Sequence, residues 1–357
     1  MNILYLSSHS VLEYDELCIL TELEQVTNPG FNINVFSMGA YTNPTQSGDY
    51  KRGVIPKGKF DPHLYNLAMQ CDKDDIHPEL LKWADVCVMM HNSALPRQKE
   101  QQRWLVRNWQ GFKDNNVKVL WRSIGQSTPA IEEELARYKA MTGLKIIRYS
   151  PLEEKIPHYA GSDALIRFAK DEDEFSGWVG DHQKLVTIAQ SFKKRSEHLG
   201  FAKFEKISGE FNPKVFGTDN EDLGVMFGGA PSYEELKAEL RGNRVFFYFG
   251  TIPAPYTLSF IEAWMTGIPV VAVGKALRRM SPYDWENYEV PELIVNGVNG
   301  FVSDNIDELK NYIRSLLDDK ELAMRIGEAG RVKAIELFGK SARMREWSDY
   351  LRRLQHE

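Results

Sequence analysis

The chain has 357 residues, of which 43% are hydrophobic and 26% are charged, and its formal net charge is −6. The length predicts two domains, and the composition is typical of globular proteins rather than disordered or collagen-like ones. The acidic excess argues against a general nucleic-acid-binding surface.

Cysteine spacing and hydropathy restrict the class of protein further. Cys18, Cys71 and Cys87 form no C-x-x-C pair, so we expect reduced cysteines rather than a disulfide framework. No stretch reaches the about 20 apolar residues of a membrane helix. The opening MNILYLSSHS has neither the basic start nor the long apolar run of a signal peptide. These features predict a cytoplasmic protein without a stable membrane span.

The first half of the chain alternates short apolar runs with helical patterns. Strands are expected at Ile3–Leu6, Ile33–Ser37, Asp85–Met90, Val117–Trp121, Leu144–Tyr149 and Ala164–Phe168. Helices are expected at about Val11–Val26, Pro78–Trp83, Gln98–Gln110, Ile131–Met141 and Pro151–Tyr159, and residues 39–75 are expected to be a long loop. Because the strands are uniformly apolar, they predict a parallel sheet that is covered by helices.

Several polar residues follow these strands directly. The carboxyl ends of parallel strands meet at one edge of a sheet, where open α/β sheets bind ligands. We therefore expect His9, His91, Arg122 and Gln126 to line a site, although a lone histidine is usually a surface or core side chain. Arg122 suits either a phosphate or carboxylate ligand or a structural salt bridge. No G-x-G-x-x-G follows the first strand, which disfavours a dinucleotide site.

No metal-ligand cluster is evident in the sequence. Asp72-Lys73-Asp74 has the form of a D-x-D metal motif, but no strand precedes it, and a solvated charge run is the favoured interpretation. The acidic run from Asp171 to Glu174, followed by Phe175-Ser176-Gly177, breaks the alternating pattern and is the best linker candidate.

The second half repeats the alternation. Strands are expected at Leu185–Ala189, Lys214–Phe216, Val225–Phe227, Val245–Phe249 and Val270–Val273. Ser232 with Glu235, and Asn305 with Glu308, form helix-start signatures. Gly267 followed by Pro269 ends the helix that begins near Tyr256.

The stretch from Val245 to Val273 is a βαβ unit that presents a helix start at the sheet edge. Its loop, Gly250 to Pro255, carries two prolines and a glycine. Amides near Tyr256, Thr257 and Leu258 can hold a phosphate with help from the helix dipole. Glu262, on the first turns of this helix, suits the hydroxyls of a ribose or a sugar.

This stretch resembles a known family. P-Y-T-L-S-F-I-E-A-W-M-T-G-I-P-V-V is similar to E-P-F-G-L-x-x-x-E-A-M-A-x-G-x-P-V, the donor-site signature of retaining glycosyltransferases of the GT-B fold, family four. Ala254 stands where that pattern has its first glutamate, and Thr257 replaces a common glycine. V-T-I-A-Q-S-F-K-K-R resembles F-V-G-R-L-x-x-x-K-G, with Ser191 at the arginine and Arg195 at the lysine. Residues 290–302 also match the following family segment.

The resemblance implies an α/β architecture of two Rossmann-like domains whose parallel sheets face a central cleft. It implies an acceptor domain over residues 1–172, a donor domain over 173–338, and a C-terminal helix in 339–357 that crosses back to the first domain. The implied reaction transfers a sugar from a UDP- or GDP-linked donor to a hydroxyl acceptor, which is a glycan, a lipid-linked molecule or a small molecule. Anomeric configuration is retained, and neither a metal nor a bound cofactor takes part.

The resemblance also assigns roles to single residues. Glu262 would take the ribose hydroxyls, the Thr257 and Leu258 amides the diphosphate, and Arg195 the diphosphate charge. The full implied donor set is Ser191, Lys194, Arg195, Pro255, Tyr256, Thr257, Leu258 and Glu262. His91, Arg195 and Glu262 are the candidate catalytic residues, and the candidate acceptor set is His9, His91, Arg122 and Gln126.

Three alternatives remain open at this point. Ala254 is compatible with a non-catalytic relative that binds nucleotide sugars. Basic clusters at Lys51-Arg52, Lys193–Arg195 and Lys275–Arg279 permit a glycosyltransferase that acts on modified DNA bases, although the net charge argues against it. An epimerase of the same fold is a lesser rival. The loop from Gly274 to Val290 interleaves cations with aromatics, which suits a sugar or a phosphate-bearing acceptor.

Overall fold

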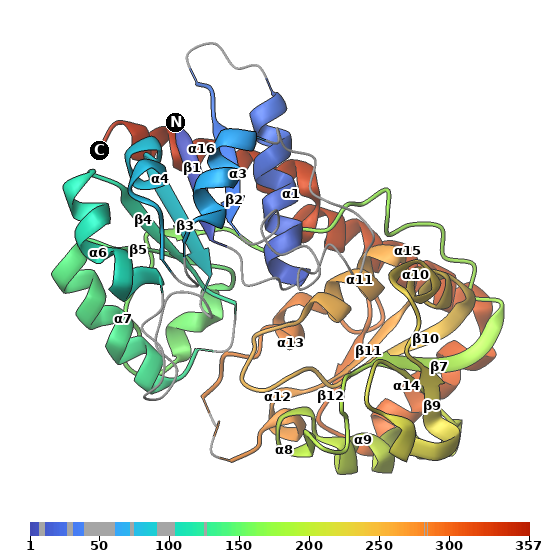
Figure 1. Ribbon diagram of the computed structural model, residues 1–357. Helices are drawn as coiled ribbons and strands as arrows, with labels where there is room; N and C mark the ends of the chain where they lie inside the picture. Colours follow the sequence, from blue (N-terminus) through green and yellow to red (C-terminus); the bar gives the residue numbers. More distant parts are fainter. Residues whose placement is uncertain are drawn as a thin grey trace. The chain divides into compact units, whose positions relative to one another are not determined.

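A computed structural model describes residues 1–6, 11–26, 31–38, 61–71, 75–90, 104–124, 127–281, 283 and 285–357 (Figure 1). The chain divides into two compact units. Unit 1 consists of Met1–Pro151, His158–Ala169 and Ser341–Glu357, and unit 2 consists of Leu152–Pro157 and Lys170–Lys340.

Unit 1 is built on a parallel sheet, which has six strands among the described residues. They are β1 (Asn2–Leu6), β2 (Asn34–Met38), β3 (Val86–Met90), β4 (Lys118–Arg122), β5 (Lys145–Arg148) and β6 (Ala164–Leu165), in the order β2-β1-β3-β4-β5-β6. The helices are α1 (Val11–Gln25), α3 (Pro62–Met69), α4 (Pro78–Trp83), α6 (Trp104–Asp114), α7 (Pro129–Thr142) and α16 (Lys340–Gln355).

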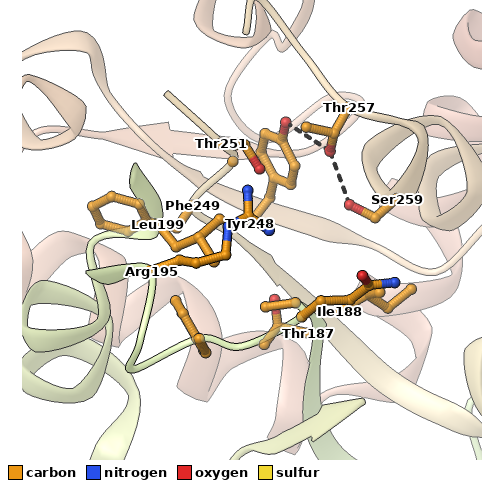
Figure 2. A pocket seen from close by; sticks show the side chains of 13 residues that line it. Thr187, Ile188, Arg195, Leu199, Tyr248, Phe249, Thr251, Thr257 and Ser259 are labelled. Carbon is orange, nitrogen blue, oxygen red and sulfur yellow. Dashed lines mark hydrogen bonds between the residues drawn. The ribbon is translucent and has the colours of Figure 1, made fainter. Parts of the chain in front are cut away.

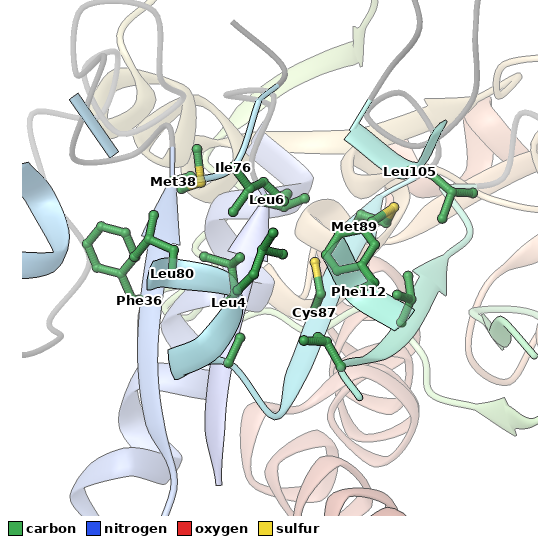
Figure 3. Close-up of a cluster of buried hydrophobic side chains, with 14 of the residues drawn as sticks. Leu4, Leu6, Phe36, Met38, Ile76, Leu80, Cys87, Met89, Leu105 and Phe112 are labelled. Atoms are coloured by element: carbon green, nitrogen blue, oxygen red, sulfur yellow. The ribbon is translucent and has the colours of Figure 1, made fainter. Parts of the chain in front are cut away.

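Helices cover both faces of this sheet because its strands are apolar on both sides. Leu4 and Leu6 of β1 join a buried cluster with side chains of α3, α4, α6 and α7, part of which Figure 3 shows. Ile3 and Tyr5, which alternate with them, pack instead with residues of α1 and α16. Trp347 of α16 is fully buried in this second cluster. Each fully buried large apolar side chain contributes about 1.5–3 kcal/mol.

Unit 2 contains a second parallel sheet, with six strands in the part of the chain that the structure describes. They are β7 (His182–Ile188), β8 (Lys214–Phe216), β9 (Phe227–Gly229), β10 (Asn243–Tyr248), β11 (Val270–Val273) and β12 (Phe301–Ser303), in the order β12-β11-β10-β7-β8-β9. The α-helices are α8 (Ser196–Leu199), α9 (Phe201–Ser208), α10 (Tyr233–Gly242), α11 (Leu258–Thr266), α12 (Lys275–Arg278), α13 (Val290–Leu293), α14 (Ile306–Asp318) and α15 (Lys320–Phe338). Short 3₁₀ helices are η1 (Pro151–Lys155), η2 (Gly209–Phe211) and η3 (Glu221–Met226).

Strand β10 is the centre of the unit 2 core, and all six of its residues are buried. Val245 and Phe247 pack in one cluster with side chains of α9 and α14. Behind β10, helix α15 approaches α11 closely. A Cβ atom at Gly330 of α15 would lie 2.5 Å from Nε1 of Trp264, so a larger residue there would push the two helices apart.

Several local predictions are confirmed by the structure. The Ser232 hydroxyl accepts from the Glu235 amide, and the Glu235 carboxylate accepts from the Ser232 amide, which completes the capping box of α10. Asn305 caps α14 through its side-chain oxygen. Gly267 ends α11 in the left-handed region, with φ 91°. The fold class, two parallel sheets covered by helices, is also confirmed.

Other local predictions are wrong. Helix α3 lies inside the predicted loop 39–75, where the Asp61 side chain caps its first amides. The predicted helix Pro151–Tyr159 is only the 3₁₀ helix η1, and the strand predicted at Ala164–Phe168 pairs over two residues. Residues 221–226 form η3, so the strand predicted at Val225 begins at Phe227. For the helix predicted at Gln98–Gln110, residues 98–103 lie outside the described part, and α6 continues to Asp114. None of the described helices combines the length and hydropathy needed to cross a bilayer.

A buried ion pair links β5 to α7 in unit 1. The Arg148 guanidinium donates to both oxygens of Glu132 at 2.7 and 2.8 Å, and their side chains are 1% and 0% exposed. The same carboxylate accepts from the Ala160 amide, and Nε of Arg148 donates to the Gly161 carbonyl. Because the carboxylate and the guanidinium are both bonded, removing one charge would leave the other buried and uncompensated.

We predict that Arg148→Met lowers the free energy of unfolding of unit 1 by about 3–5 kcal/mol. Urea denaturation followed by tryptophan fluorescence measures the loss. Arg137→Met is the matched control, because the Arg137–Glu134 pair is exposed and its loss should leave the midpoint nearly unchanged. Equal midpoints for the two variants would contradict the prediction.

Candidate functional site

A cavity of about 180 Å³ lies at the carboxyl ends of β7 and β10 (Figure 2). It is lined by residues from the end of β7 and the following loop, from the end of β10, and from the start of α11. Sites that hold a whole drug-sized ligand measure about 300–1,000 Å³. This cavity therefore matches part of a ligand, such as a phosphate or diphosphate group.

The sheet topology explains why the cavity lies there. Strand β10 pairs with β7, although β8 and β9 come between them in sequence. The chain leaves β7 towards one edge of the sheet and returns at β10 to build the other edge. The loops after β7 and β10 thus separate at a topological switch point, where open α/β sheets bind ligands.

Arg195 is the cation of this cavity. Its guanidinium makes no hydrogen bond or ion pair with the described residues. Its neighbours differ, because Lys193 donates to the Asp222 carbonyl and Lys194 pairs with Asp219. The Asp219 carboxylate raises the pKa of Lys194, so this lysine is committed to an exposed ion pair. Arg195 remains available to bind an anion.

A buried asparagine holds the loop that carries Arg195 in place. Asn220 accepts from the Phe192 amide at 2.8 Å and donates to the Ala189 carbonyl at 2.7 Å. Gly217, in the same loop as Asn220, packs against the Ala189 backbone: a Cβ at that position would lie 2.1 Å from the Ala189 oxygen, and its φ is +137°. These contacts position the cation without touching a ligand.

The start of α11 faces the same cavity. Thr257 is the N-cap, but its hydroxyl makes no capping hydrogen bond. The amides of Leu258 and Ser259 make no hydrogen bond with the described residues, so donors and the positive end of the helix dipole are available to an anion. The Thr257 hydroxyl lies instead 3.2 Å from the Tyr248 hydroxyl and 2.9 Å from that of Ser259 (Figure 2).

The loop between β10 and α11 is held by side chains of the segment 274–290. Arg278 is 5% exposed and donates to the carbonyls of Thr251 and Ala254. Asn287 donates to the Pro253 carbonyl. Arg278 therefore braces the loop, which corrects its interpretation as part of an acceptor surface. Lys275 and Arg279 also pair internally, with Glu292 and Glu286.

The predicted donor residues divide into two groups. Arg195 and Thr257, which are distant in sequence, line one cavity. Ser191 and Lys194 both bond to Asp219 beside it, and Tyr256 is buried with its ring 5.1 Å from that of Phe338. Pro255 is also buried, and its carbonyl accepts from the Glu289 amide. Neither these four nor Leu258 and Glu262 are among the described residues that line the cavity.

Glu262 is turned away from the cavity and towards the start of unit 2. Its carboxylate lies 2.6 Å from Nζ of Lys170 and 3.5 Å from the Tyr233 hydroxyl, and the two charged side chains are 7% and 1% exposed. Glu262 lies about one helical turn beyond Ser259, where its side chain meets Tyr233 of α10 and Lys170. The ribose-binding role of Glu262 stays a prediction.

The predicted acceptor residues belong to unit 1. Arg122 is fully buried, where its Nε donates to Glu16 at 2.7 Å and its guanidinium lies over the Phe168 ring. The structure therefore has the salt bridge that the sequence left open. His9, His91 and Gln126 lie outside the described residues, as does Asp72-Lys73-Asp74. The described part of the chain contains no group of three or more His, Cys, Asp or Glu side chains suited to a metal ion.

Comparison with solved structures shows the fold. HepE of Anabaena, in structures with UDP or with UDP-glucose, matches with a TM-score of 0.66 at 14% identity, covering 98% of this chain and 99% of that one. The chain has the GT-B fold. A glycosyltransferase from Rickettsia africae and sucrose-phosphate synthase from Thermosynechococcus elongatus match with TM-scores of 0.64 and 0.61, each at 15% identity and over 100% of this chain and 99% of the other. No protein-family model and no curated protein matches the sequence.

Sequence reasoning missed Tyr248, Ser259 and Asn220. Tyr248 ends an apolar strand and gave the pattern of a core residue, and Ser259 lies within a helical pattern. The signal that could have found Tyr248 is its hydroxyl, which stands at the end of a predicted strand shortly before a predicted helix start. Asn220 belongs to a different loop, so only the packing of that loop against the cavity reveals its part.

We predict that Arg195→Ala weakens pyrophosphate binding about tenfold or more while leaving the thermal midpoint of the free protein unchanged. A charge-assisted hydrogen bond to the ligand is lost, but no partner among the described residues is left unpaired. Isothermal titration at low ionic strength gives the affinity. Lys194→Ala, which removes a neighbouring cation that is already paired, should change the affinity far less. Equal losses in the two variants would sink the assignment of Arg195.

Proposed function

We propose that the protein is a glycosyltransferase that transfers a sugar from a nucleoside-diphosphate sugar to a hydroxyl acceptor. The observation that carries the proposal is the cavity in which Arg195, which has no partner among the described residues, lines the same walls as the uncapped start of α11. A diphosphate supplies the charge and the acceptor oxygens that this combination of a cation and free amides binds best.

The fold neighbours support this choice of donor. HepE structures contain UDP, UDP-glucose, or UDP with glucose. A uridine nucleotide is therefore the first donor to test for this chain, with GDP-linked sugars next. The acceptor class in the proposal is a glycan, a lipid-linked molecule or a small molecule that carries a free hydroxyl.

The chemistry of the cavity suits departure of a nucleoside diphosphate. Negative charge grows on the leaving phosphate as the glycosidic bond breaks, and in this proposal Arg195 with the Leu258 and Ser259 amides stabilises it. This charge stabilisation needs no metal or bound cofactor in the reaction that we propose. The enzyme would thus be metal-independent.

Retention of anomeric configuration is part of the proposal. Retention through a covalent intermediate requires a carboxylate nucleophile beside the anomeric carbon. The described residues that line the cavity include no Asp or Glu. A front-face attack, in which a donor phosphate oxygen accepts the proton of the incoming hydroxyl, is consistent with that set of residues.

The experiment that tests the proposal is thermal stabilisation by a panel of nucleoside diphosphates and nucleotide sugars. We expect one base to stabilise wild type by about 2.7 kcal/mol at a hundredfold excess over its dissociation constant. The effect should fall in Arg195→Ala. Arg195 is a better probe than Glu262, because replacing Glu262 would strand the buried charge of Lys170 and destabilise the fold itself. Absence of stabilisation by every nucleotide, with Mg²⁺ or without it, would overturn the proposal.

A second candidate is a binding protein that keeps the donor site without catalysis. The observation that favours it is Ala254, which is 4% exposed and stands where the family pattern has a glutamate. If that carboxylate is essential for transfer, wild type should bind the donor and form no product.

We predict that Ala254→Glu discriminates between the two functions. Under the enzymatic proposal the new carboxylate enters a buried loop position held by Arg278, so the rate of sugar transfer should fall severalfold or more. Transfer from the stabilising nucleotide sugar to a panel of hydroxyl acceptors measures the rate. A large rise would favour a site that has lost its catalytic carboxylate.

A further inference from the structure

Three hydroxyl groups form a chain along one wall of the cavity. The Tyr248 hydroxyl, at the end of β10, lies 3.2 Å from Oγ1 of Thr257, and Oγ1 of Thr257 lies 2.9 Å from Oγ of Ser259 (Figure 2). Tyr248 is 2% exposed, whereas Thr257 and Ser259 are partly exposed. All three line the cavity together with Arg195. The chain thus runs from a buried end to an accessible one.

The direction of the first hydrogen bond follows from the burial of Tyr248. Burial raises the pKa of the Tyr248 hydroxyl, which therefore keeps its proton at neutral pH. A buried O–H needs an acceptor, and among the described residues the acceptor within hydrogen-bond distance is Oγ1 of Thr257. Tyr248 therefore donates to Thr257. Either hydroxyl can donate between Thr257 and Ser259, and donation from Thr257 continues the polarisation of the chain in the same sense.

One proton is then left over at the accessible end. Three hydroxyls carry three protons, and the two hydrogen bonds between them use two. With Thr257 donating to Ser259, the remaining proton belongs to Ser259, at the N-terminal turn of α11. The hydroxyl chain then ends in an O–H donor near the Arg195 cation and two amides that have no partner among the described residues.

We propose that Tyr248 is a positioning residue for phosphate recognition, because its buried hydroxyl orients the Thr257–Ser259 pair so that Ser259 donates to a diphosphate oxygen of the nucleotide sugar. The ligand of this hydroxyl chain is an oxyanion rather than a neutral hydroxyl in this proposal, since Arg195 and the amides of Leu258 and Ser259 are donors that cannot accept from a hydroxyl. The inference rests on the proposed function and adds side-chain donors to the backbone amides of α11.

Tyr248→Phe and Ser259→Ala test the proposal, singly and together. UDP and uridine are the probes, and isothermal titration gives the affinities. Ser259→Ala should weaken UDP binding about tenfold to a hundredfold, because it removes a donor to a charged acceptor. Tyr248→Phe, which removes only the orientation of that donor, should weaken UDP binding about threefold to tenfold. Uridine binding should not change in either variant.

The double variant separates positioning from a purely structural role. If Tyr248 acts through Ser259, the double variant should bind UDP no more weakly than Ser259→Ala alone. Additive losses would overturn the proposal, as would an unchanged affinity in Tyr248→Phe. Tyr288→Phe is the matched control, because Tyr288 is 3% exposed in the same unit and its hydroxyl has no hydrogen-bond partner among the described residues. It should leave UDP binding unchanged.

Failure of this inference is distinguishable from failure of the proposed function. If wild type binds UDP and Arg195→Ala weakens it while Tyr248→Phe does not, the donor site stands and the role of Tyr248 is wrong. If GDP replaces UDP as the ligand of wild type, the same variants are tested with GDP and guanosine. If wild type binds no nucleoside diphosphate, both proposals fall.

Discussion

The parallel pairing of β7 with β10 is the constraint on which the candidate site depends. Val245 lies opposite Leu185 and Phe246 opposite Val186, although two strands separate them along the chain. This register ends both strands at the same level, so the loop that carries Arg195 and the loop that leads to Thr257 open into one cavity. All six residues of β10 are buried, and the hydrophobic stabilisation of that strand maintains the register.

Behind the cavity, buried polar side chains hold each wall in place. Asn220 fixes the loop before Arg195, and Arg278 fixes the loop before α11. Fixed donors cost little reorganisation when charge develops on a ligand, which is the condition for electrostatic stabilisation of a leaving group. The network is also polar and buried, so each member needs its partner, and the loss of one leaves others unsatisfied.

The Lys170–Glu262 ion pair ties α11 to the point where the chain enters unit 2. The Lys170 amide donates to the Phe338 carbonyl, so the entering segment lies beside the end of α15. The Glu262 carboxylate thus connects α11 with the segment at Lys170, which in turn is bonded to the end of α15. A buried pair of this kind is weak evidence of added stability, but breaking it is costly.

Local signals were the ones that the sequence expressed clearly. Gly267, the Ser232–Glu235 box and the Asn305 cap act within a few residues, and all three are confirmed. Helix α3 was not predicted, because this eight-residue helix with a capping aspartate lies within a polar segment that contains prolines. The strand predicted at Val225 failed because the apolar pattern of a 3₁₀ turn and that of a short strand are alike.

By itself the sequence determined the two parallel sheets, the βαβ unit from Val245 to Val273, and the helix start at Thr257, while the family resemblance pointed to Arg195. Apolar strand patterns, caps and loop composition are properties of neighbouring residues, so they survive without coordinates. Only the tertiary structure decided which polar side chains are already bonded inside the protein. In the tertiary structure Glu262 pairs with Lys170, Arg122 pairs with Glu16, and Arg278 donates to the loop carbonyls. Tyr248 and Ser259 lie beside Thr257. A charged residue has the same appearance in sequence whether its partner is a ligand or a distant side chain, because that partner is chosen by packing.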